Sequence, residues 1–213
     1  MVAYATGCPW ESLAKDCTCG AELTLEHLVC CRFGGEKLHR HNMVQHRFAA
    51  FAHEQGMAVR QNVRQSIDEA VEMRKRQEPD IIFYPGISKP LETDITVVNP
   101  CCPSKIRHTL NKPHWATHDA GARKRAKYEH TARLRGNDFA PLVFETHGNR
   151  CKEVDDLLFK LADSTTGSKS WVARDMALDL AVTLVRGNAH CARMRSRLAK
   201  SRELALLGPR VDS

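Results

Sequence analysis

Four side chains able to ligate a metal lie within fifteen residues near the start of this 213-residue chain. Cys17 and Cys19 are separated by one residue and followed by Gly20, and His27 precedes Cys31 by four positions. Sulfur and nitrogen donors together are typical of tetrahedral zinc. So short a segment holds too little apolar material for a core of its own, and bound metal would supply its folding free energy. We therefore expect a structural Zn²⁺ site at Cys17, Cys19, His27 and Cys31.

Two further cysteines compete for this site. Cys30 is an alternative to Cys31 for the last position, and Cys8 is an outside candidate. The chain has nine cysteines, an odd number, and no recognisable export signal, so metal binding is favoured over disulfide formation. The alternative to a zinc site is that these cysteines are ordinary buried or surface residues and that His27 is simply hydrogen-bonded. Since no apolar run is long enough to cross a bilayer, we expect an intracellular chain with no membrane partner.

The hydrophobic pattern predicts an α/β domain with additions at both ends. With 42% hydrophobic and 27% charged residues, the chain can bury a core. The expected elements are a helix at 38–55, strands at 58–65, 81–84 and 91–98, a polar loop at 105–118, a helix at 119–135, a strand at 140–146, and two or three helices within 151–207, separated near 164–168 and at Gly187-Asn188. We divide the chain into a zinc-knuckle module (1–36), a core (37–150) and a helical extension (151–213).

The charge distribution favours a polyanionic partner. The chain carries 32 Lys and Arg against 25 Asp and Glu, a formal net charge of +7. Residues 107–135 hold eight Lys or Arg and two acids, and residues 186–202 hold six Lys or Arg and no acid. These two segments are interpreted either as a surface that contacts nucleic acid or as ordinary helix faces exposed to solvent.

Two aspartates are placed to share a cation. Asp80 opens the strand at 81–84, and Asp94 lies fourteen positions later in the next strand, so a hairpin would bring them together. Side chains alternate along a strand, so Glu92, Asp94 and Thr96 point to one face. Two neighbouring carboxylates repel each other unless a cation lies between them. A hard divalent ion such as Mg²⁺ would relieve that repulsion and leave coordination positions for water and a phosphate.

A basic helix follows thirty residues after the second aspartate. Lys124 and Tyr128 are one turn apart and share a face, while Lys127 lies in the neighbouring row. A lysine beside metal-bound carboxylates can position the attacking water or stabilise charge that develops on phosphorus.

These motifs, in this order, resemble the C-terminal zinc knuckle and restriction-like endonuclease region of site-specific non-LTR retrotransposon proteins, a branch of the PD-(D/E)XK nuclease superfamily. The resemblance spans residues 17–189. Its motifs are the Cys17, Cys19, His27 and Cys31 set, Arg40-His41-Asn42, Pro79-Asp80, Asp94, Lys124, Lys127 and Tyr128, with weaker matches at Thr146-His147-Gly148 and Arg186-Gly187-Asn188-Ala189.

The resemblance implies a PD-(D/E)XK mixed sheet flanked by helices, with Asp80 and Asp94 binding a catalytic Mg²⁺ or Mn²⁺. The carbonyl of Ile95 would complete the coordination. The superfamily's usual lysine two positions after the second acid is replaced here by Thr96. In the retrotransposon branch the lysine comes from the following helix, which maps to Lys124, with Lys127 as the alternative. The implied DNA contacts are Arg123, Arg125, Lys127 and Tyr128.

The implied activity is a metal-dependent DNA endonuclease in the nucleus. In the family, the nick exposes a 3′ hydroxyl that primes reverse transcription of element RNA. The chain has no Tyr-x-Asp-Asp polymerase signature, so a reverse transcriptase would lie upstream in the same polyprotein or be separate. Two alternatives are a zinc-containing module that binds DNA or RNA without cutting it, and a nuclease that resolves Holliday junctions. Glu145 is an additional candidate for either the metal site or an ordinary ion pair.

Overall fold

The computed structural model describes residues 16–31, 33–61, 79–86, 88–164 and 167–207. The elements within them are α2 (Leu25–Cys30), α3 (Glu36–Glu54), β1 (Ala58–Gln61), β2 (Ile81–Tyr84), β3 (Leu91–Val98), α4 (Ile106–Asn111), α5 (Trp115–Leu134), β4 (Asp138–Glu145), α6 (Lys152–Leu161), the 3₁₀ turn η2 (Ala162–Ser164) and α7 (Lys169–Leu207). None of the helices in these ranges combines the length and the apolar character that crossing a membrane requires.

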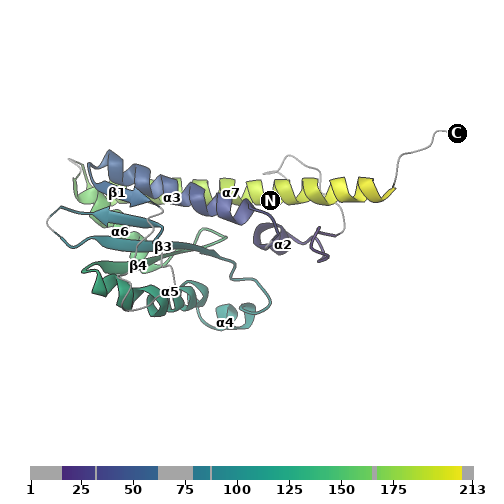
Figure 1. Cartoon of the computed structure of the whole chain (residues 1–213), viewed down its shortest axis with the longest axis horizontal. Coiled ribbons are helices and arrows are strands. Elements are labelled where there is room, and N and C mark those ends of the chain that lie inside the picture. Colours follow the sequence, from purple (N-terminus) through teal and green to yellow (C-terminus); the bar gives the residue numbers. More distant parts are fainter. Residues whose placement is uncertain (1–15, 32, 62–78, 87, 165–166, 208–213) are drawn as a thin grey trace.

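A four-stranded mixed sheet in the order β1-β2-β3-β4 forms the centre of the molecule. The predicted hairpin of β2 and β3 is confirmed: the strands are antiparallel, with Ile81 opposite Thr93. β3 and β4 are parallel, with Asp94 opposite Pro141, and α4 and α5 form the crossover between them. In Figure 1 the sheet lies between α3 and α7 on one side and α5 on the other. The predicted mixed sheet flanked by helices is therefore confirmed.

The two faces of β4 show why both helical layers are needed. On one face Phe144 packs against Phe48 of α3, with ring centroids 6.1 Å apart. On the other, Gly121 of α5 comes close to Pro141 and Val143, so that a side chain there would meet both. Alternate residues of the strand are thus buried under different helices. A strand buried on both faces reads as a nearly continuous apolar run.

The expected break at Gly187-Asn188 is wrong, because α7 runs through both residues without interruption. Gly187 is instead a close-packing position: a β-carbon there would lie 2.6 Å from Cγ of Arg40 on α3. Asn188 accepts a hydrogen bond from Arg40 Nη1 at 2.7 Å and donates one to the carbonyl of Thr146 at 2.7 Å. These two residues therefore join α7 to α3 and to the end of β4.

Two smaller differences concern element boundaries. The expected loop at 105–118 contains the short helix α4, and its last four residues begin α5. The expected strand at 58–65 is β1 as far as Gln61, and residues 62–65 lie outside the described ranges.

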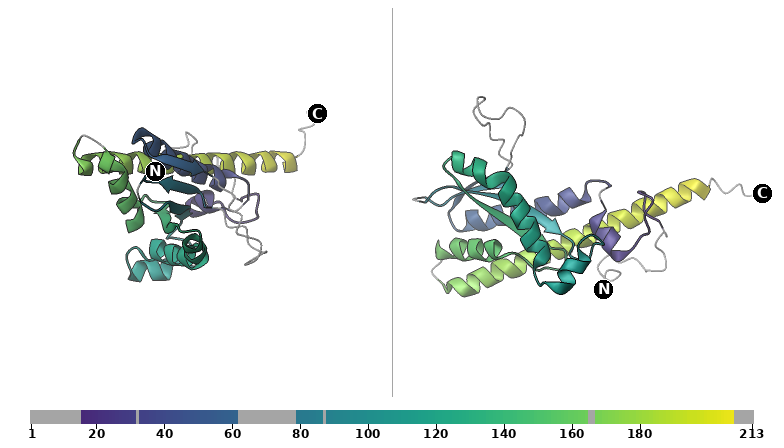
Figure 2. Two further views of the ribbon diagram at one scale, coloured as in Figure 1. Left: turned by 60° about the vertical axis from the view of Figure 1, so that its left-hand side comes forward. Right: turned by 90° about the horizontal axis from the view of Figure 1, so that it is seen from below.

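The N-terminal Cys/His segment packs on the C-terminal half of α7, as Figure 2 shows for α2. Cys17, Leu28 and Cys31 form a small buried cluster with residues of α7. Beside it, Glu36 at the start of α3 makes an almost fully buried ion pair with Arg195 of α7. Segments from opposite ends of the sequence therefore share one interior.

Candidate functional site

The Cys17–Cys19 segment is a tight turn. The Gly20 amide donates to the Cys17 carbonyl at 2.9 Å, and the Cys17 amide donates to the Ala21 carbonyl at 2.8 Å. Gly20 has φ of +86°, a conformation that glycine adopts at little cost. The turn holds both thiols on the same side as α2, which supplies His27.

The sulfur and nitrogen atoms of this turn and of α2 converge as a metal site requires. The ligand atoms of Cys17, Cys19, His27 and Cys31 all lie within 4.8 Å of one another. Cys17 Sγ is 3.7 Å from Cys31 Sγ, and Cys19 Sγ is 3.3 Å from His27 Nε2. In a tetrahedron with zinc–sulfur bonds of about 2.3 Å, two sulfurs lie about 3.8 Å apart. The cluster therefore has the donor set and the dimensions to hold Zn²⁺.

The environment of Cys17 favours a thiolate. Burial acts to raise its pKa, but hydrogen bonds from the Cys19 amide and from the side chains of His27, Cys19 and Cys31 lower the pKa to about 6. Cys30 does not join the cluster: burial raises the pKa of its thiol, which lies beside the Asn99 side chain. The structure thus places Cys31, not Cys30, at the cluster, while Cys8 lies outside the described residues.

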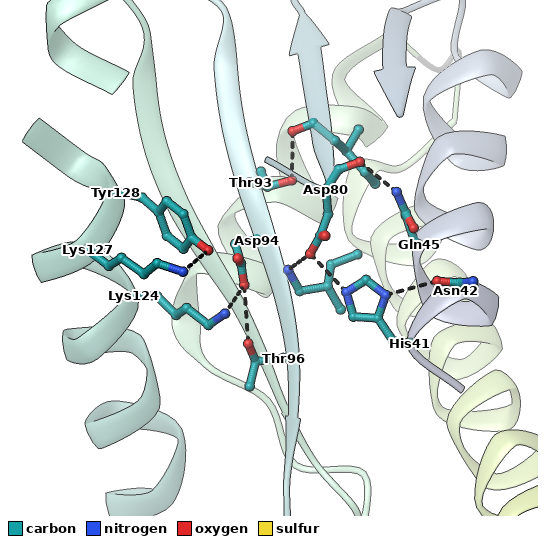
Figure 3. A network of polar contacts seen from close by, with 12 residues as sticks. His41, Asn42, Gln45, Asp80, Thr93, Asp94, Thr96, Lys124, Lys127 and Tyr128 are labelled. Atoms are coloured by element: carbon teal, nitrogen blue, oxygen red, sulfur yellow. Dashed lines mark hydrogen bonds and ion pairs between the residues drawn. The ribbon is translucent and has the colours of Figure 1, made fainter. Parts of the chain in front are cut away.

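A second polar centre lies on β2 and β3, about the two predicted aspartates (Figure 3). The Asp80 amide donates to the Thr93 carbonyl at 2.9 Å, which continues the pairing of the two strands. The Asp80 side chain then turns toward β3, where its Oδ2 accepts a 2.6 Å hydrogen bond from the Ile95 amide. The carboxylate of Asp80 therefore contacts the backbone of the residue that follows Asp94.

Asp94 is almost completely buried, with 5% of its surface exposed, and α5 supplies its counter-charge. Lys124 Nζ lies 2.6 Å from Asp94 Oδ2. Thr96, which shares the face of Asp94, donates to the same oxygen at 3.3 Å. Lys124 of α5 and Thr96 of β3 therefore contact the same oxygen of the Asp94 carboxylate.

Lys127 and Tyr128 border the same centre. Lys127 Nζ donates to the Tyr128 hydroxyl at 2.7 Å, and Lys124 Nζ lies 5.6 Å from the centroid of the tyrosine ring. Burial and then the negative charge of Asp94 raise the pKa of Tyr128, and the Lys124 charge opposes them. Asp80 also contributes to this shift, so both carboxylates act on one phenol.

Sequence reasoning did not assign roles to two residues of α3 that hold Asp80. His41 Nε2 lies 2.9 Å from Asp80 Oδ2, and Gln45 Nε2 donates to the Asp80 carbonyl at 2.6 Å. Burial acts to lower the pKa of His41, but the hydrogen bond to Asp80 and its charge outweigh burial and raise it. The available signal was their spacing: residues four apart, bordering the apolar Val44 and Phe48, belong to the buried face of the helix.

Other predicted residues lie apart from this centre. Arg125 pairs with Glu153 of α6 at 2.6 Å, and the exposed Arg123 pairs with Asp119 at 3.0 Å on its own helix. Glu145 lies opposite Val98, four residues and therefore about 13 Å along β3 from Asp94. The parallel pairing thus separates Glu145 from the two aspartates.

Glu92, on the same face as Asp94, has a different partner. It receives hydrogen bonds from Arg135 Nε at 2.8 Å, from Arg135 Nη2 at 2.5 Å and from Asn137 Nδ2 at 2.7 Å. These contacts fix the end of α5 against β3. They thereby hold the helix that carries Lys124 in register with Asp94.

Together these features define a mixed α/β protein with a Cys₃His cluster that could bind zinc and a buried aspartate–lysine centre. No known family model matches the chain, and a search of curated proteins found no significant similarity. Its function must therefore be argued from the geometry of these two centres.

Proposed function

We propose that the chain is a metal-dependent DNA endonuclease of the PD-(D/E)XK type. One observation carries the proposal: two acids on neighbouring antiparallel strands and a lysine from the following helix are linked by short contacts. Asp80 accepts a hydrogen bond from the amide after Asp94, and Lys124 lies 2.6 Å from the Asp94 carboxylate. His41 and Lys124 already partner the two carboxylates, so a divalent cation bound to both would share them with these side chains.

The donor set of this centre fits a hard divalent cation. Asp80 and Asp94 offer carboxylate oxygens, the ligands that Mg²⁺ and Mn²⁺ prefer. Bound there, the ion would lower the pKa of a water molecule and neutralise charge on a phosphodiester. His41 and the Ile95 amide orient the Asp80 carboxylate by hydrogen bonds at 2.9 and 2.6 Å.

The remaining residues act on the DNA. The Lys124 ammonium stabilises the negative charge that develops on the phosphoryl oxygens when the bond to the leaving oxygen breaks. Lys127, held on the Tyr128 hydroxyl, contributes positive charge one turn along the same helix. The Cys₃His cluster, once it holds zinc, stiffens the N-terminal segment against α7.

The biological role that we propose is the nicking of target DNA in the nucleus for retrotransposon integration by target-primed reverse transcription. The partners are then duplex DNA, element RNA and a reverse transcriptase. This part rests on the motif order, since the same aspartates and lysines would serve a nuclease with a different target.

A plasmid-nicking assay with Mg²⁺ or Mn²⁺ tests the activity. We expect Asp94→Asn to abolish nicking and to keep DNA binding. The matched control is Asp138→Asn, an exposed acid at the start of β4 in the same sheet, which should nick like the wild type. Unchanged nicking by Asp94→Asn would falsify the assignment. Tight binding by the wild type without metal-dependent nicking would instead identify a nucleic-acid-binding module that does not cut.

A further inference from the structure

The basic residues in the second half of α7 form a line along one face of the helix. Arg186, His190, Arg193, Arg197 and Lys200 are spaced by four, three, four and three residues, which places them in one row. Four of them are exposed and His190 is half-buried. At about 1.5 Å per residue, this row, which we call the α7 basic stripe, is about 21 Å long.

The other basic residues of the same segment serve the fold. Arg195 is buried in its pair with Glu36, and Arg202 donates to the Thr18 carbonyl at 2.9 Å. By contrast, within the described ranges the arginines and the lysine of the stripe form no ion pair with an acid. Residues 186–202 contain no Asp or Glu at all. Residues 186–202 therefore supply no acid of their own to neutralise the charge of the stripe.

A histidine of α3 extends this positive surface. The ring of His39, an exposed residue, lies 4.3 Å from the ring of His190. Burial and then the neighbouring charges of His39 and Arg193 lower the pKa of His190. These neighbours therefore disfavour the protonated form of His190, and a bound polyanion would favour it.

The stripe and the aspartate–lysine centre lie on different sides of α3. His41 points to Asp80, whereas His39, two residues earlier and hence about 200° away around the helix, contacts α7. A nucleic-acid segment on the stripe would therefore be separated by α3 from one at Asp94. The stripe is an additional surface and does not depend on whether the chain cuts DNA.

We propose that the α7 basic stripe binds the sugar–phosphate backbone of nucleic acid. Charges that converge on one point suit a single phosphate, whereas a straight row of charges on a rigid helix suits a linear polyanion. Each strand of a duplex carries one charge per about 3.4 Å of helix axis, so the length of the stripe is enough to contact several phosphates. Arginine, which supplies three of its five residues, binds phosphate through paired hydrogen bonds.

Charge reversal in the zinc-containing full chain tests this proposal. The stripe variant is Arg193→Glu, Arg197→Glu and Lys200→Glu. The control variant is Lys152→Glu, Lys160→Glu and Lys169→Glu, exposed residues on α6 and at the start of α7. Each variant replaces three positive charges by three negative ones and so lowers the formal net charge of +7 by six. Circular dichroism and zinc content establish that both are folded.

Affinity is measured by fluorescence anisotropy at several salt concentrations without Mg²⁺, on a labelled 30-base-pair DNA duplex and on single-stranded RNA of the same length. We expect the stripe variant to lose at least tenfold in affinity, and its salt slope to fall by about 2–3 on duplex. The control should stay within about threefold of the wild type. A loss confined to one probe identifies that nucleic acid as the ligand.

Two results would overturn the proposal. One is wild-type affinity in the stripe variant. The other is an equal loss in both variants, which would mean that only net charge matters. Should the glutamate variant fail to fold, Arg193→Gln, Arg197→Gln and Lys200→Gln removes the charge without reversing it, and a loss of at least fivefold is then expected.

Discussion

Replacing Gly187 by alanine separates what helix propensity predicts from what the packing predicts. In the interior of a helix, alanine is more stable than glycine by about 1 kcal/mol. In this structure, however, the new methyl group would lie 2.6 Å from Cγ, 3.1 Å from Cβ and 3.3 Å from Cα of Arg40. The Cα atom belongs to the backbone of α3, so this contact cannot be relieved by a change of rotamer.

Arg40 is also held at its far end. Its Nη1 donates to the Val29 carbonyl at 3.0 Å and to Asn188 Oδ1 at 2.7 Å, and only 2% of its surface is exposed. Overpacking of this kind typically costs about 1–3 kcal/mol. Because one of the atoms met belongs to the backbone, we place this site in the upper part of that range, about 2–3 kcal/mol, from which the propensity gain of about 1 kcal/mol is subtracted. We therefore expect Gly187→Ala to lower the free energy of unfolding by about 1–2 kcal/mol.

Urea unfolding followed by circular dichroism measures this change. Gly167→Ala is the matched control, because a β-carbon there meets no atom within 4 Å and its backbone lacks a positive φ. The control should unfold at the wild-type midpoint or slightly above it. A Gly187→Ala protein as stable as the wild type, or more stable, would show that α3 and α7 do not pack as closely as described.

Three further predictions concern the two centres and the buried ion pair. Lys124→Ala should reduce plasmid nicking by about 10²–10³-fold, and Lys127→Ala by less, when both are measured at saturating metal. Cys31→Ser should lose the bound zinc and Cys30→Ser should keep it, as measured by metal analysis of the purified proteins; the reverse would reassign the ligand. Glu36→Ala leaves its buried arginine partner on α7 uncompensated and should cost about 3–5 kcal/mol in urea unfolding; a loss below about 1 kcal/mol would contradict the burial of that pair.

Parts of both candidate centres could be predicted from the sequence, because the residues concerned lie close together in the chain. The turn between Asp80 and Asp94 predicted that the segments carrying them form an antiparallel pair, since such pairing of neighbouring strands follows from a short connection. Cys17 and Cys19 could be predicted as ligands of one cluster for the same reason. Between Cys30 and Cys31 the sequence was ambiguous, because adjacent positions differ only in the direction of their side chains. The structure separates them through the end of α2, where Cys31 faces the other ligands.

Residues whose partners are distant in sequence could not be assigned in this way. His41 is 39 positions from Asp80, and Arg40 is 148 positions from Asn188. The hydrophobic periodicity of a helix predicts which of its faces is buried, but not which strand or helix packs against that face. The Gly187-Asn188 pair was misread for this reason, because a glycine that ends a helix and one that admits a neighbouring helix look alike in sequence.

The amino-acid sequence by itself determined the mixed α/β class, the turn between β2 and β3, and the kinds of ligand present, because alternation, turn residues and donor types are properties of short segments. Tertiary structure decided which cysteine joins the Cys₃His cluster, that α3 holds Asp80, and that α7 continues past Gly187. Each of these depends on how elements remote in the chain pack together, and the close packing of a protein interior is fixed only once all of its elements are in contact.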